Sequence, residues 1–227
     1  MEKLPIEEFI QWDVRTWSRA LKYWDTQVAW NTIENALELG AREGGLSLWL
    51  ASKGKRVLCT DYEDAEKIGR PLHEKHGLTS LVAYENVDAT KIPYTNHFDL
   101  IVFKSIIGGI GRFGGIDAQR QVFLEIHKAL KPGGVLLFAE NMQSSALHQR
   151  LRKRHNAWGN YWRYVSLKEL SEFLEPFSLH TLKTTGFYGT LGRSEAQKRL
   201  FSRMDELGPN ALFPASWKYL GYGIAVK

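Results

Sequence analysis

The sequence predicts an α/β fold: a doubly wound, mostly parallel sheet of seven strands with helices on both faces. Short apolar runs alternate with stretches of helical spacing along most of the chain. The run FDLIVF at 98–103 is almost continuously apolar, which is typical of a strand covered on both faces. Gly40, Gly44 and Gly45 follow the first apolar run, at the point where a strand must turn into a helix.

The expected elements follow one another in this alternating order. Strands are predicted at 36–39, 56–60, 81–87, 98–103, 135–139, 179–185 and 218–226. Helices are predicted at 44–52, 65–76, 117–130, from 166 to 174 and at 193–206. Asp117 is the expected cap of its helix, and the KPGG stretch at 131–134 is expected as a tight turn into the fifth strand.

The ends of the chain fit one domain over 1–227. Residues 6–31 place apolar and aromatic side chains at helical spacing, so 1–34 is predicted to form an N-terminal helical cap. The segment 140–165 is longer than a strand-to-helix connection needs and is predicted as an insertion or lid after the fifth strand. There is no internal repeat, low-complexity tract or linker.

Composition excludes several classes of protein. With 44% hydrophobic and 24% charged residues in 227, the chain is typical of a globular protein. Its apolar runs are too short to span a membrane, and residues 1–20 are more polar than a signal peptide. Cys59 is the single cysteine, so no internal disulfide is possible, and no ligand-spaced cluster predicts a metal. We expect a cytoplasmic protein, and its oligomeric state is left open.

The positive charge is local. Residues 141–168 contain six Lys or Arg and no acid, so subtracting this +6 from the net charge of +5 leaves the rest at −1. This distribution favours a site or a face over general binding to polyanions.

The glycine loop does not match the two commonest phosphate-binding patterns. Arg42 stands where the dinucleotide fingerprint G-x-G-x-x-G has its second glycine, which disfavours an NAD-dependent oxidoreductase. No Gly-Lys-Ser/Thr follows, so a Walker loop is absent. The glycines alone are equally compatible with a plain strand-to-helix turn.

Four short motifs in register carry more information than the loop alone. Glu38-Leu39-Gly40 ends the first strand, Asp61 ends the second, Asp88-Ala89 follows the third, and LKPGG at 130–134 precedes the fifth. Over 36–139 this ordered set resembles the class I S-adenosylmethionine (SAM)-dependent methyltransferase family. The resemblance implies the Rossmann-like methyltransferase fold and SAM as the cofactor. Arg42 departs from the pattern, because many members carry another glycine there.

The resemblance also implies which residues hold the cofactor. Glu38 would orient the ammonium group of SAM, Asp61 would accept its ribose hydroxyls, and Asp88 would accept from the adenine amino group. These carboxylates are expected to face one common cavity, although each alone would fit a helix cap or a turn. The full set is Glu38, Gly40, Ala41, Gly44, Asp61, Tyr62, Asp88, Ala89 and Lys104.

The acceptor is predicted to contact the segments after the fourth and fifth strands. The second of these interleaves cations with aromatic residues, as a wall for an anionic or sugar-like acceptor would. A solvated basic helix whose aromatic residues dock on the core explains the same pattern. The candidates for acceptor binding are Ser105, Arg152, Arg154, Trp158 and Trp162.

Methyl transfer from a sulfonium is an in-line displacement that depends mainly on placing the nucleophile. A general base is optional, and His148 and His155 are the candidates, with packing roles as the alternative.

The predicted function is O-methylation of a small-molecule or glycan acceptor. Alternatives are an RNA or protein methyltransferase gripping through the basic 148–168 segment, and a non-catalytic cofactor-binding partner subunit. Nucleic acid is disfavoured because the fourth strand is not followed by the Asn/Asp-Pro-Pro-Tyr/Phe motif of base methylases.

Overall fold

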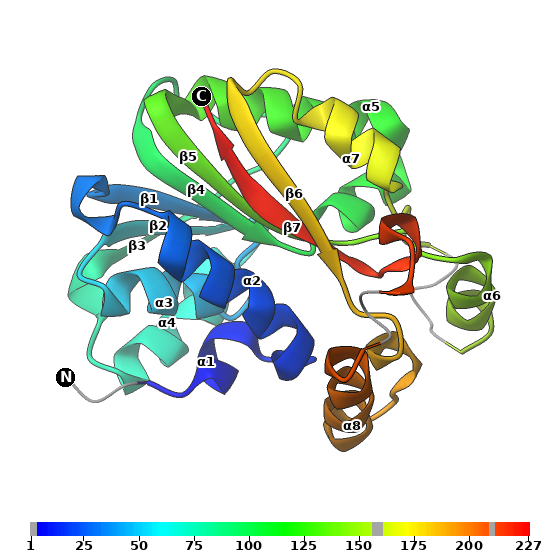
Figure 1. Cartoon of the computed structure of the whole chain (residues 1–227). Helices are drawn as coiled ribbons and strands as arrows, with labels where there is room; N and C mark the ends of the chain where they lie inside the picture. Colours follow the sequence, from blue (N-terminus) through cyan, green and yellow to red (C-terminus); the bar gives the residue numbers. More distant parts are fainter. Residues whose placement is uncertain (1–3, 156–160, 209–211) are drawn as a thin grey trace.

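The computed structural model describes residues 4–155, 161–208 and 212–227. Its seven strands form one sheet in the order β3-β2-β1-β4-β5-β7-β6 (Figure 1). The strands are β1 (Asn35–Leu39), β2 (Arg56–Asp61), β3 (Val82–Asn86), β4 (Phe98–Lys104), β5 (Leu130–Asn141), β6 (Leu179–Thr185) and β7 (Leu220–Val226). Strands β1 to β5 pair in parallel, and β7 runs antiparallel to both β5 and β6. The predicted fold class is confirmed.

Helices cover both faces of the sheet (Figure 1). They are α1 (Ile6–Ile10), α2 (Val14–Gln27), α3 (Gly45–Ser52), α4 (Ala65–Lys75), α5 (Ile107–Ala129), α6 (Ala146–His155), α7 (Leu167–Phe173) and α8 (Glu195–Glu206). One hydrophobic cluster buries Trp17 and Trp24 of α2 with Trp49 of α3. The other buries Phe123 of α5 with Phe173 of α7. Strand β4 contributes side chains to both clusters and is therefore covered on both faces, as its sequence predicts.

The glycine-rich stretch after β4 is helical, which the sequence did not predict. Helix α5 begins at Ile107 instead of residue 117, and Gly115 breaks it with a φ of 65° and a ψ of −156°. The Glu140 carboxylate accepts a hydrogen bond from the Ile107 amide at 2.8 Å and so holds the helix start. The Trp162 indole packs directly on Gly108, where any side chain would collide with it.

The KPGG stretch also differs from its prediction, because it lies within β5 as an irregularity. The β4–β5 register shifts between Phe98 and Leu100, and Gly133 has a φ of 76°. In the described ranges no helix is both long and apolar enough to cross a membrane.

The chain reverses its direction of travel across the sheet between β1 and β4. After β1 it builds β2 and β3 on one side, and it then returns to place β4 on the other. Such a switch point leaves a crevice beyond the carboxyl ends of the two strands.

Candidate functional site

A cavity of about 1070 Å³ lies at this switch point. Pockets that hold small ligands have volumes of roughly 300–1,000 Å³, so there is room for both a donor and an acceptor. Its walls come from the segment 11–13 between α1 and α2, the loop after β1, and the ends of β4 and β5. Helix α6, the short 3-10 helix η4 (Gly189–Leu191) and α8 complete it.

The loop after β1 turns through three left-handed residues. Gly40, Arg42 and Gly44 have φ values of 62°, 51° and 77°. Arg42 therefore takes the backbone conformation that a glycine would supply at that position, so its side chain does not divert the loop. The Arg42 amide donates to Asp61 Oδ2 at 2.7 Å. His73 Nε2 lies 2.9 Å from the carbonyl oxygen of Gly44, to which it donates, and this holds the far end of the loop.

Glu38 and Lys104 line the cavity, and Glu38 is buried whereas Lys104 is half-buried. Glu38 Oε2 accepts from the Ser47 amide at 2.6 Å, and burial raises the pKa of this carboxyl to about 7. The Lys104 ammonium lies 3.2 Å from the centre of the Trp12 ring and donates to the Ile10 carbonyl. Burial lowers the pKa of Lys104 to about 7, in spite of Glu38 nearby. A bound ammonium group would favour the ionised form of Glu38.

Asp61 and Asp88 lie at the ends of adjacent strands, but neither lines this cavity. Asp61 accepts from the Arg42 and Tyr62 amides, both at 2.7 Å. Because a carboxylate has about four acceptor positions, two remain for ribose hydroxyls. Asp88 Oδ1 accepts from the amide and hydroxyl of Thr90, at 2.8 and 2.7 Å. The common cavity that we expected for the two carboxylates is not shown, and their roles toward SAM stay predictions.

The remaining cofactor candidates divide in the same way. Gly40 and Ala41 line the cavity, whereas Gly44, Tyr62 and Ala89 do not. Tyr62 is 68% exposed, so it stands free beside Asp61 where a flat ring could stack on it.

Arg152 is the cation that the structure places deepest in the acceptor wall. It is 8% exposed and lines the cavity. Its Nη1 donates to the Met142 carbonyl at 2.6 Å, and its guanidinium carbon lies 4.2 Å from the centre of the Tyr164 ring. Among the described residues no carboxylate lies within ion-pair distance of Arg152. A buried guanidinium without a countercharge is suited to bind an anion.

The other predicted acceptor residues have different positions. Ser105 and Trp162 line the cavity, and the Ser105 hydroxyl accepts from Asn141 Nδ2 at 2.6 Å. Arg154 is exposed and does not line it. Trp158 lies outside the described residues.

The structure does not favour His148 as a general base. Its Nδ1 lies 2.6 Å from the Ser145 hydroxyl and its Nε2 lies 2.8 Å from the Phe187 carbonyl oxygen. Because a carbonyl only accepts, Nε2 must donate, and Nδ1 then accepts from Ser145. No lone pair is left for an acceptor's proton, and burial lowers the pKa of the ring. His155 ends α6, and its side chain lies outside the described part of the structure.

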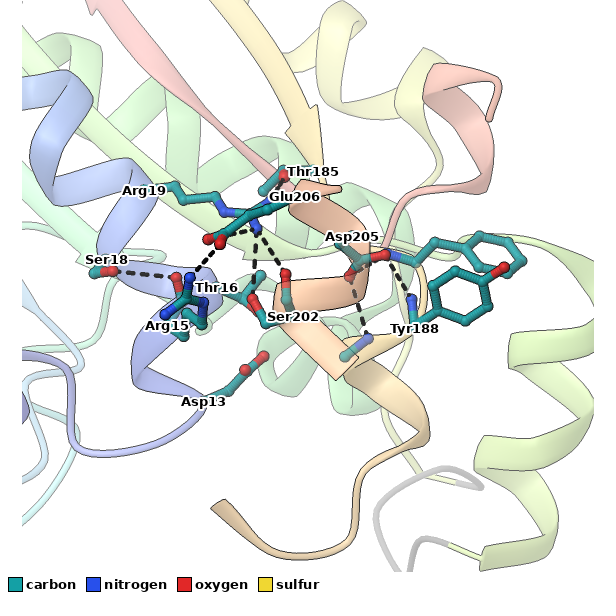
Figure 2. A network of polar contacts seen from close by, with 12 residues as sticks. Asp13, Arg15, Thr16, Ser18, Arg19, Thr185, Tyr188, Ser202, Asp205 and Glu206 are labelled. Atoms are coloured by element: carbon teal, nitrogen blue, oxygen red, sulfur yellow. Dashed lines mark hydrogen bonds and ion pairs between the residues drawn. The ribbon is translucent and has the colours of Figure 1, made fainter. Parts of the chain in front are cut away.

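Asp13 is a site residue that sequence reasoning missed. It is 5% exposed, lines the cavity, and accepts from the Tyr219 hydroxyl at 2.6 Å through Oδ2. Its Oδ1 is buried without a hydrogen-bond partner in the described structure. Burial raises the pKa of Asp13 to about 6. Figure 2 shows it beside the start of α2, facing α8. No motif could have found it, because Asp13 and Tyr219 are 206 positions apart.

The cavity wall is cationic overall. Five cations line it, namely Arg42, Lys104, Arg152, Arg193 and Lys198. Against them stand two carboxyl groups, Asp13 and Glu38, so the formal balance is 5 − 2 = +3. No group of three or more metal-ligating side chains occurs among the described residues.

Known proteins match the half of the molecule that carries the glycine loop. Residues 37–138 match the family model described as a methyltransferase domain. The ubiquinone/menaquinone biosynthesis C-methyltransferase UbiE of Shewanella oneidensis is 31% identical over 110 residues. Over this range the chain is therefore similar to class I SAM-dependent methyltransferases in both sequence and strand order. The predicted resemblance to this family is therefore confirmed for residues 37–138, and the same match supports methyl transfer and SAM as the cofactor.

The similarity to UbiE is partial, since it covers 48% of this chain and 41% of the relative. Solved structures extend the likeness in fold. Phosphoethanolamine N-methyltransferase 2 of Haemonchus contortus, in complex with SAM, has a TM-score of 0.62 at 18% identity, over 93% of this chain and 52% of that one. The [4+2]-cyclase SpnF has a TM-score of 0.62 at 17% identity, over 92% of this chain and 80% of that one. The same fold thus also occurs in a protein named for another reaction.

Proposed function

We propose that this methyltransferase transfers the methyl group of SAM to an oxygen of a small-molecule or glycan acceptor that carries an anionic group. The observation that carries the proposal is Arg152, a buried cation without a carboxylate partner among the described residues. It lines the same cavity as Glu38 and Gly40, at the end of the strand where the donor is expected. The formal charge of the wall supports the same class of acceptor.

The residues at the donor end fit SAM. Glu38 is a buried carboxyl beside the loop and would attract the ammonium group, while Asp61 keeps two acceptor positions for ribose. When bound, SAM supplies a methyl group on a positively charged sulfur, which is already activated for displacement. The chain's main task is to place the nucleophile in line, and such placement can supply roughly 7–11 kcal/mol.

Asp13 is the group best placed to take up the proton of an acceptor hydroxyl. Its raised pKa, about 6, lies close to neutral pH, where a general base works best. Methyl transfer to a hydroxyl forms the O–C bond, breaks the S–C bond and releases the hydroxyl proton, which the Asp13 carboxylate would accept. Tyr219 would hold that carboxylate in position through its 2.6 Å hydrogen bond.

The names of the similar proteins support an anionic acceptor more than a particular methylated atom. The Haemonchus enzyme is named for phosphoethanolamine, which carries a phosphate group, and it shares the fold of this chain. UbiE is named as a C-methyltransferase. The choice of oxygen in our proposal depends on Asp13, since a hydroxyl needs a proton acceptor.

Two measurements test the proposal. Calorimetry with SAM and with NAD should show binding of SAM only, and tight NAD binding without SAM binding would refute it. Fractions of cell extract from an anion-exchange column should then be incubated with isotopically labelled SAM and analysed by mass spectrometry. The labelled product is expected in the retained fractions and should carry its methyl group on oxygen. A product found only in the unretained fractions would contradict the role of Arg152.

A further inference from the structure

Helix α8 is attached to the protein through its polar side. The Asp205 carboxylate is 1% exposed and accepts from the amides of Phe187, Tyr188 and Gly189 at 3.0 to 3.3 Å. The Thr16 hydroxyl of α2 donates a hydrogen bond to the buried Ser202 hydroxyl at 3.1 Å. Figure 2 shows this network between α2 and α8, with Arg19 reaching both Ser202 and Glu206.

The opposite side of α8 is apolar and faces solvent. Leu200, Met204 and Leu207 are spaced four and three positions apart, so they form one stripe along the helix. They are 58%, 41% and 86% exposed. A surface helix normally turns its apolar stripe to the core and its polar side to water, and α8 does the reverse. Leu212, in the segment after the helix, is also 84% exposed.

The surface beside this stripe carries unpaired positive charge. Arg199 and Arg203 are exposed on α8, and neither has a carboxylate within ion-pair distance in the described structure. Two acidic residues of the helix form ion pairs with other cations: Glu195 pairs with Lys198 of α8, and Glu206 pairs with Arg15 and Arg19 of α2.

Helix α6 adds cations at the same end of the molecule. Its exposed cations Arg150, Lys153 and Arg154 likewise form no ion pair with a described residue. Figure 1 shows α6 and α8 beyond the same end of the sheet, and both pack against η4.

We propose that α8 lies on a membrane surface that carries anionic lipid headgroups. The stripe of Leu200, Met204 and Leu207 enters the boundary between headgroups and acyl chains, and Arg199 and Arg203 contact lipid phosphates. An amphipathic helix with a basic polar flank binds at this interface without spanning the bilayer. The inference does not depend on which acceptor is methylated.

A second copy of the chain fits these observations less well. A stable interface buries about 800 Å² on each partner, and one short stripe of three side chains is small for that purpose. A two-fold contact between two α8 helices would also bring their exposed arginines near one another.

Flotation of the full chain with vesicles tests the proposal. Vesicles of phosphatidylcholine with about 30% phosphatidylglycerol should carry the protein up the gradient, and pure phosphatidylcholine should carry far less. Raising the salt from about 0.1 M to about 0.5 M should lower the bound fraction several-fold. Leu207→Asp should lower it at least roughly five-fold, because a charge replaces the most exposed side chain of the stripe.

Matched variants separate the stripe from general effects. Leu179→Asp changes a leucine that is 70% exposed on the edge strand β6, and it should leave vesicle binding unchanged. Arg203→Glu should weaken binding, whereas Lys168→Glu on α7 should not. Equal binding to both vesicles, no binding, or equal loss with Leu179→Asp would each overturn the proposal. A dimer in light scattering that Leu207→Asp dissociates would assign the stripe to a second copy instead.

Discussion

The two halves of the proposed site are built from the chain in different ways. The proposed donor half comprises the residues at the ends of β1, β2 and β3, of which only those at the end of β1 line the cavity, and each follows directly from a strand and the turn after it. The acceptor half comprises the segment 11–13, α6, η4, α8 and Tyr219, which come from both ends of the chain. Asp13 meets Tyr219 across 206 positions, while Arg42 meets Asp61 across 19.

This difference fits the extent of the match to the methyltransferase-domain model. A donor site made from local turns can persist in sequence, because each turn needs only its own few residues. An acceptor site made from distant segments can change with every substrate while the sheet stays the same. The matched range 37–138 agrees, since it includes β1 to β4 and leaves α1, α2, α6 and α8 outside.

Asp13→Asn should give the largest effect and lies in the acceptor half. We expect kcat to fall about 100-fold, because the amide cannot take up the acceptor's proton. Wild-type kcat should rise with pH through about 6, the value to which burial raises the pKa of Asp13, and the variant should lose this rise. SAM binding by calorimetry should be unchanged. Asp25→Asn, on the exposed side of α2, is the control, and an equal loss there would remove Asp13 from the mechanism.

The same variant should be more stable than the wild type at neutral pH. The pKa of Asp13 is raised in the folded state from 3.8 to about 6, so its protonated form is the one that folding favours. The contribution of Asp13 to the free energy of unfolding is therefore most favourable below pH 3.8, and it becomes less favourable as the pH rises through about 6. This rise of the Asp13 pKa from 3.8 to about 6 corresponds to a loss of about 3 kcal/mol in the free energy of unfolding between low and neutral pH. Thermal unfolding should show the gain of Asp13→Asn at pH 8 and little gain at pH 4.

The fold could be predicted because its signals are local. Alternating apolar runs predict the strands, and the ordered set of four motifs from Glu38 to Gly134 predicts the resemblance to the family. The start of α5 was predicted at residue 117 instead of Ile107 because five glycines suggested a loop. In the structure the Glu140 carboxylate binds the first amide of the helix, and the Trp162 ring packs on its glycines. Both contacts come from residues far along the chain.

The acceptor half could be predicted only as a composition. Its cations were recognised as a group, but the sequence does not tell Arg152, which is buried, from Arg154, which is exposed. His148 was named as a base from its residue type, and only the structure shows that Ser145 and Phe187 occupy both of its nitrogens. Asp13 belongs to no motif and is recognised by its burial alone.

Arg152→Met tests whether the buried cation of the acceptor half binds the acceptor. The acceptor's KM should rise at least about 30-fold, because removing one partner of a buried charge pair costs roughly 2–5 kcal/mol. The Kd of SAM should stay the same. Arg154→Met, two positions away and exposed, should leave both constants unchanged. If the two variants behave alike, the segment acts as a diffuse charged surface and not as a site.

Asp61→Ala tests the donor half in the same manner. We expect the Kd of SAM to rise about ten-fold in calorimetry, since two ribose hydroxyls lose their acceptor. The acceptor's KM at saturating SAM should not change. Glu63→Ala removes an exposed acid two positions away and is the matched control. An unchanged Kd of SAM in Asp61→Ala would show that the end of β2 is not part of the donor site, and the proposed division into two halves would be wrong.

Arg42→Gly should have the smallest effect on SAM binding of the variants considered. The Arg42 backbone already has a φ of 51°, and its amide donates to Asp61. Glycine accepts that conformation and keeps the amide, so the Kd of SAM should change less than about three-fold. Relief of the left-handed strain and the entropy of glycine nearly cancel, so the free energy of unfolding should stay within about 1 kcal/mol.

Arg42→Val is the contrasting variant. A β-branched side chain resists the left-handed region, so the amide should leave Asp61 and SAM binding should weaken about as much as in Asp61→Ala. The opposite pattern, with glycine harmful and valine tolerated, would show that the loop depends on the arginine side chain. The donor half would then depend on the residue by which its loop departs from the pattern of the family that it resembles.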